Sequence, residues 1–163
     1  MSAGDNAHNP KPDRDLSRLA PNFRAVVEAA IADCQNAGFD AMVYEGYRTL
    51  ELQKIYYARG RTVIPPKKKV TNAPTNLYSW HGFGLAVDVV HRTLYWNPPE
   101  GLAWFKKVSD IFKQHNCKWG GDWTKPDPPH MQWGRCKPSP SDEARRQLAT
   151  GGLEAVWTAL GAK

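Results

Sequence analysis

Several common features are missing from this 163-residue chain: it has no long apolar run, no paired cysteines and no internal repeats. A membrane-spanning helix needs about 18 uninterrupted apolar residues, and no segment approaches that length, so we expect no such helix. The start, Met1 to Asn6, also lacks the charged and then apolar pattern of a secretory signal peptide. We therefore expect a protein that first accumulates in the cytoplasm.

The cysteines argue against a disulfide framework. There are three, an odd number, and no two of them have Cys-x-x-Cys spacing. Cys34, Cys117 and Cys136 are therefore expected to be reduced thiols in a cytosolic product. His115 could join Cys117 and Cys136 in a structural zinc site, but the absence of a paired spacing disfavours it.

Acidic residues are absent between Leu52 and Val87, and the run of lysines at 67–69 falls inside this stretch. Over the whole chain, 22 Lys and Arg against 16 Asp and Glu give a net charge of +6. A solvated loop is the ordinary interpretation of any single lysine, whereas a basic patch can attract an anionic polymer. No nucleic-acid-binding motif accompanies the charge, so an anionic cell envelope is favoured over nucleic acid.

The chain divides into three parts. Polar residues and two prolines predict a flexible arm at 1–15, followed by one domain at 16–137 and a helical extension at 138–163 that packs on it. Within the domain, residues 61–78 are predicted to form a long loop. Such loops are uncommon in compact domains unless they act as lids or binding elements.

Apolar spacing predicts the secondary structure. Residues at i, i+3, i+4 and i+7 indicate helices, expected after Pro21, after a Thr49 cap, from about Pro99, at 141–149 and at 153–160. Short apolar runs indicate strands, expected at 39–44, 84–90 and 130–133. Helices mixed with short strands favour an α+β fold in a single domain.

One segment combines small residues with metal-binding side chains. If residues 84–90 are extended, Gly84, Ala86 and Asp88 lie on one face and leave space beside the carboxylate, while the apolar residues between them face the core. His81 stands across a glycine turn and could fold back to the same place. A lone histidine beside glycine is more often a turn or core residue, so this segment alone leaves both interpretations open.

A second segment supplies another histidine, His130, with Asp127 three residues before it. Two imidazoles and one carboxylate form the ligand set of a catalytic zinc site, which keeps one position for water. Zinc lowers the pKa of that water to about 7, and a carboxylate that is not a ligand can take its proton.

Three motifs resemble those of a known family. Ser79-x-His81-x-x-Gly84-x-Ala86-x-Asp88 is similar to the signature of zinc D-alanyl-D-alanine carboxypeptidases and L-alanyl-D-glutamate peptidases, whose superfamily includes the hedgehog signalling domain. Residues 119–123 with Asp127-x-x-His130 resemble its second motif, and residues 45–49 with Gln53 resemble an upstream one. The motifs occur in the right order over 45–132, whereas nothing from about Pro138 onward matches.

The resemblance implies a hedgehog/DD-peptidase-like fold, in which helices flank a small antiparallel sheet, and it implies bound Zn²⁺. It gives His81, Asp88 and His130 as zinc ligands and Asp127 as general base. Arg48 is implied as the cation that stabilises negative charge on the substrate as it develops.

Substrate contacts are expected from Arg48, Gln53, Ser79 and Trp123. Each has an ordinary alternative: a surface ion pair for Arg48, a helix-surface position for Gln53, a turn cap for Ser79, and burial in the core for the tryptophan.

The resemblance implies a zinc metallopeptidase that hydrolyses stem peptides of bacterial peptidoglycan. Aspartate at position 127 resembles the L-alanyl-D-glutamate endopeptidase branch. A chain without a signal peptide further suggests a bacteriolytic, phage endolysin-like monomer that waits in the host cytoplasm before it reaches the cell wall. The alternatives are a D-alanyl-D-alanine carboxypeptidase, which needs a free substrate carboxylate, and a non-catalytic cell-wall-binding module.

Overall fold

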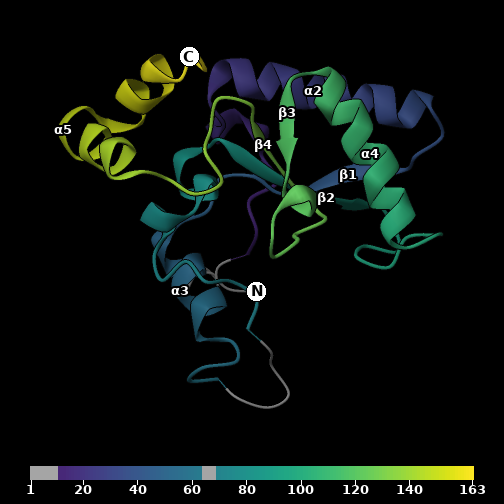
Figure 1. The fold of residues 1–163 in the computed structure, drawn as a ribbon, viewed down its shortest axis with the longest axis horizontal. Coiled ribbons are helices and arrows are strands. Elements are labelled where there is room, and N and C mark those ends of the chain that lie inside the picture. The colour runs from purple at the N-terminus through teal and green to yellow at the C-terminus, as the bar shows by residue number, and fades with distance from the viewer. Residues whose placement is uncertain (1–10, 64–68) are drawn as a thin grey trace, which may run out of the picture.

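The sheet at the centre of the molecule has four antiparallel strands in the order β1-β2-β4-β3. The computed structural model describes residues 11–63 and 69–163. The strands are β1 (Ala41–Glu45), β2 (Ala86–His91), β3 (Cys117–Trp119) and β4 (His130–Trp133). Helices α2 (Pro21–Asn36) and α4 (Leu102–Gln114) lie along one side of the sheet, and α3 (Leu50–Ala58) lies away from them, at the lower left of the view (Figure 1). This arrangement confirms the predicted α+β fold with a small antiparallel sheet.

The helices on the sheet follow the apolar spacing of the sequence. In α2 the predicted stripe is buried, including Phe23, Val27 and Cys34. The Thr49 cap of α3 is also confirmed, because its hydroxyl accepts a hydrogen bond from the Leu52 amide. Buried residues of α2 and α4 pack with those of the sheet in one core.

Several predicted boundaries were wrong, including that of the strand expected at 39–44, which spans Ala41–Glu45, and one strand was not predicted. Helix α4 begins at Leu102 rather than near Pro99, because Glu100 and Gly101 have φ of +67° and +55° and are not helical. Strand β2 begins at Ala86 rather than Gly84. Strand β3 has only three residues, which is too short for its periodicity to be recognised.

Gly84 was also assigned to the wrong face. It has φ of +68° and ends the 3-10 helix η3 (Trp80–Phe83). A Cβ atom added there would lie 2.8 Å from the Arg18 carbonyl oxygen. Gly84 therefore packs against the N-terminal segment and does not line the space beside Asp88.

The C-terminal residues form α5 (Asp142–Ala159), which is interrupted at Gly152 (φ +72°), between the two helices predicted at 141–149 and 153–160. The Trp157 indole donates a hydrogen bond to the Phe83 carbonyl oxygen, and the Trp133 indole donates to that of Leu160, each over 2.7 Å. Figure 1 shows the C-terminus beside the start of α2, where the backbone N–H of Asn22 donates to the Ala162 carbonyl oxygen over 2.8 Å. Segment 138–163 thus contacts both the sheet and α2.

Other predicted segments lie partly outside the described residues. These are residues 1–10 of the predicted arm and 64–68 of the basic loop, which include two of its lysines.

Among the helices that the structure describes, none is long and apolar enough to cross a membrane. The three cysteines are buried and free, and His115 bonds to Asp33 over 2.7 Å.

Candidate metal and active site

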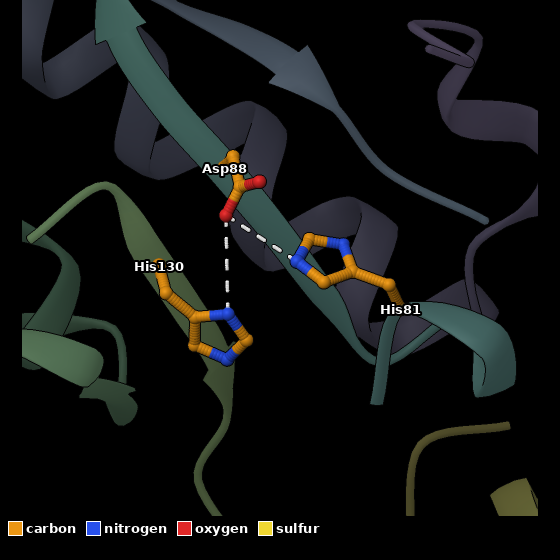
Figure 2. A group of neighbouring side chains, drawn as sticks. All are labelled: His81, Asp88 and His130. Atoms are coloured by element: carbon orange, nitrogen blue, oxygen red, sulfur yellow. Dashed lines mark ion pairs between the residues drawn. The ribbon is translucent and has the colours of Figure 1, made fainter. Parts of the chain in front are cut away.

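Three side chains from different elements converge at one end of the sheet. His81 comes from η3, Asp88 from β2 and His130 from the first residue of β4, and Figure 2 shows both imidazoles facing the carboxylate. His81 Nε2 lies 3.3 Å and His130 Nδ1 lies 3.9 Å from Asp88 Oδ1. The structure therefore brings together the three residues expected to bind a metal.

The three ligand atoms lie close enough together to share one metal ion. Bonds of about 2.0–2.1 Å to zinc place neighbouring ligand atoms roughly 3.3 Å apart, and the three ligand atoms here lie within 4.8 Å of one another. In residues 11–63 and 69–163, this is the only group of at least three His, Cys, Asp or Glu side chains with such spacing.

Each imidazole is oriented by the nitrogen that faces away from Asp88. His81 Nδ1 lies 2.9 Å from the Gly46 carbonyl oxygen, and His130 Nε2 lies 2.8 Å from Gln132 Oε1. A proton on each of these outer nitrogens leaves the inner nitrogen with a free lone pair. This is the usual way in which a protein fixes the tautomer of a metal-binding histidine.

The charges in the cluster also suit a cation. Burial opposes ionisation of Asp88, but the neighbouring His81 and Arg48 outweigh it and hold the pKa of this carboxyl well below its usual range. Burial lowers the pKa of His130 to about 4, so its imidazole is neutral at pH 7. An ionised carboxylate and a neutral imidazole are the protonation states that bind metals.

Asp127 lies next to the cluster without completing it. Its Oδ2 is 3.8 Å from His130 Nδ1, and half of its side chain is exposed. Burial of the carboxyl and the negative charge of Asp88 raise the pKa of Asp127 to about 6. The turn that carries Asp127 packs closely on Gly120, where an added Cβ would lie 2.6 Å from the Asp127 carbonyl oxygen.

Arg48 approaches Asp88 from the β1 side, with Nη2 3.7 Å from Oδ2. The expected alternative, an ion pair with Glu45, is also present, but this pair is buried rather than on the surface. Gln53 Oε1 accepts a further hydrogen bond from Arg48 Nη1 over 2.8 Å. The guanidinium is thus fixed in place while it still lines the cavity.

A cavity of about 1020 Å³ opens over these residues. Ser79 and Trp123 line it, and the Trp123 ring lies 4.8 Å from that of His130. Ser79 also caps η3, since its hydroxyl accepts the His81 amide proton. Gln53 is fully buried behind Arg48, so it is not on the helix surface, and its Oε1 contacts the guanidinium.

Sequence reasoning missed two partners of the site. Gln132 is buried and orients His130; its position two residues along the same strand, which puts both side chains on one face, was a usable signal. The Gly46 carbonyl was not foreseeable, because backbone acceptors leave no mark in the residue pattern.

Comparison with known proteins agrees with this geometry. Residues 72–133, which contain His81, Asp88 and His130, match the family model described as D-alanyl-D-alanine carboxypeptidase. Over 126 residues the chain is 29% identical to the peptidoglycan L-alanyl-D-glutamate endopeptidase CwlK of Bacillus subtilis (strain 168), across 71% of this chain and 74% of that protein. Over these residues the chain is similar to peptidases of this kind.

Solved structures of such peptidases share the fold. The L-Ala D-Glu endopeptidase ChiX of Serratia marcescens superposes with a TM-score of 0.55 at 20% identity, over 81% of this chain and 95% of that one. A variant of the vancomycin resistance D,D-pentapeptidase VanY, in complex with Zn(II), superposes with a TM-score of 0.53 at 19% identity, over 91% of this chain and 93% of that one.

Proposed function

We propose that this metallopeptidase is a zinc-dependent peptidoglycan hydrolase that cleaves the L-alanyl-D-glutamate bond of stem peptides. The observation that carries the proposal is the convergence of His81, Asp88 and His130 beside an aspartate and an arginine. The similarity to CwlK over most of the chain supports the choice of bond.

The protein groups around the ligands have complementary roles. Zinc, when bound, supplies a Lewis acid that polarises a carbonyl and lowers the pKa of water. Asp127, whose raised pKa of about 6 lies near the working pH, takes the proton of the attacking water and passes it to the leaving amine. Arg48 stabilises the negative charge that develops on the substrate oxygen, since its guanidinium remains charged at any working pH.

A second candidate is a D-alanyl-D-alanine carboxypeptidase, which the description of the matching family favours. The same residues would serve this reaction, but the substrate would have to end in a free carboxylate. A non-catalytic wall-binding module is disfavoured, because the described cavity holds a metal-binding cluster, an acid–base group and an arginine together.

The products of purified peptidoglycan decide between these candidates. Endopeptidase activity releases peptides with new D-glutamate amino ends and leaves L-alanine carboxyl ends, whereas carboxypeptidase activity releases only terminal D-alanine. Mass spectrometry distinguishes the two sets. The activity should stop with a chelator and return with zinc, and cleavage that a chelator leaves unchanged would refute the metal mechanism.

Peptidoglycan as substrate is consistent with the net charge of +6, which favours approach to an anionic envelope. A monomeric state, an endolysin role and a stay in the host cytoplasm remain predictions of the sequence. Analytical ultracentrifugation and lysis of whole cells from outside would test the first two.

A further inference from the structure

An exposed aromatic cluster borders the cavity on its β1 side. The cluster consists of Tyr44, Tyr95 and Trp96, and two of its members, Tyr44 and Trp96, line the cavity that also holds Asp88. The ring centres of Tyr44 and Trp96 lie 4.5 Å apart. Trp96 is 50% exposed and Tyr95 40%, although aromatic side chains of this size are usually well buried. The cluster is therefore an apolar surface open to solvent at the edge of the catalytic cavity.

Two backbone irregularities present these rings. The pairing of β1 with β2 shifts between Val43 and Glu45, so Tyr44 is the extra residue of a β-bulge. Bulges redirect side chains and are frequent beside active sites. Tyr95 has φ of +54°, which is unfavourable for a bulky residue. Its turn is closed by reciprocal backbone hydrogen bonds with His91 of 3.0 and 3.1 Å, and such strain is concentrated at functional sites.

Packing among the rings fixes their orientation. The Arg14 guanidinium lies 4.7 Å from the centre of the Tyr44 ring, and its Nε donates to the Tyr44 carbonyl oxygen over 3.1 Å. Trp96 meets Tyr44 edge-on, at 67°, and stacks on Tyr95 at 27°. An aromatic surface that is already ordered loses little conformational freedom when a ligand binds.

We infer that the aromatic cluster binds a sugar ring of the glycan strand that carries the stem peptide, an inference that rests on the proposed function. In peptidoglycan the L-alanine of the stem is attached to a sugar, so an enzyme that cuts after this alanine works one residue from carbohydrate. Tryptophan is favoured where one side of a contact is apolar and the other is wet. A pyranose offers such a contact, because its C–H face can cover the exposed ring while its hydroxyls stay in water. The cavity of about 1020 Å³ also lies at the upper end of the usual range for ligand sites, about 300–1,000 Å³, and leaves room beyond a dipeptide.

The test compares two substrates that differ only in the sugar: a stem peptide that carries its disaccharide and the same peptide without it. The wild-type enzyme should prefer the first substrate. The ratio compared is kcat/KM with the disaccharide divided by kcat/KM without it. In Trp96→Ala this ratio should fall about 3- to 10-fold, the range expected for the loss of one aromatic contact. Trp96→Phe, which keeps an aromatic face, should retain most of the preference.

The matched control is Leu94→Ala, at a residue that is 47% exposed near the cluster but does not line the cavity. It should keep the wild-type ratio. An unchanged ratio in Trp96→Ala, or an equal fall in Leu94→Ala, would overturn the inference. So would a wild-type protein that sediments as a dimer and a Trp96→Ala variant that sediments as a monomer, because the cluster would then be a contact between two copies. A wild-type enzyme that cleaves both substrates without preference overturns this inference alone, whereas one that cleaves neither overturns the proposed function as well.

Discussion

Asp88 on β2 lies directly opposite His130 on β4 in the antiparallel register. Facing residues of such a pair have Cβ atoms about 4.5–5.5 Å apart on the same side of the sheet. The backbone hydrogen bonds of the sheet therefore set the separation of two of the three candidate ligands. The third, His81, is on η3 and is held by its hydrogen bond to the Gly46 carbonyl oxygen.

Replacement of Asp127 separates proton transfer from metal binding. Asp127→Asn should lower kcat by about 10²- to 10⁴-fold, the usual contribution of a general base, while the purified protein keeps its zinc. Metal content by atomic emission and kcat on a stem peptide measure the two effects. A variant with near wild-type kcat would refute the assignment of Asp127, and loss of zinc would make it a ligand instead.

Gln132 should control metal affinity through His130. Gln132→Ala removes the acceptor that fixes the His130 ring, and the loss of such a partner weakens metal binding about 10- to 100-fold. Competition with a zinc chelator measures the affinity. Gln114→Ala, at an exposed position in the last turn of α4, is the control and should bind zinc as the wild type does. Equal affinities in the two variants would contradict the role of Gln132.

The contribution of Arg48 to kcat should depend on the shape of its guanidinium as well as on its charge. Its guanidinium contacts Glu45 and Gln53 while it lies near Asp88, and a lysine ammonium offers no comparable planar fork of donors. Arg48→Lys should therefore lower kcat about 10²- to 10³-fold, as removal of a donor to a developing oxyanion does. Arg92→Lys, in an exposed ion pair with Asp40, should change kcat little. An Arg48→Lys enzyme with normal kcat would limit Arg48 to a structural role.

The sequence was most informative about features that a local pattern of residue types records. The helical stripes could be predicted because apolar residues recur at helical spacing in the sequence. The ligand set was implied by the resemblance to known motifs and stays a prediction. The sequence did not reveal that Gly84 turns back toward Arg18, that Gln53 is buried, or that Tyr44 forms a bulge. These features depend on contacts between distant segments, which no local pattern records.

Two groups at the site make opposite contributions to the pH dependence of stability in zinc-free protein. The pKa of His130 falls from 6.5 to about 4 on folding, so the unfolded chain binds more protons between these values and acid destabilises the fold. The pKa of Asp127 rises from 3.8 to about 6, so the folded chain binds more protons there and acid stabilises it. The two effects oppose each other between about pH 4 and 6.

Asp127→Asn should therefore expose the His130 effect. With a chelator present, the free energy of unfolding of this variant should fall more steeply than that of the wild type as the pH drops from 6 to 4. One proton bound differently corresponds to at most about 1.4 kcal/mol per pH unit, and exposure of half the Asp127 side chain reduces this difference. Urea unfolding at several pH values measures the slopes. Asp142→Asn, at a highly exposed aspartate, should follow the wild-type slope, and parallel slopes for all three proteins would refute the raised pKa of Asp127.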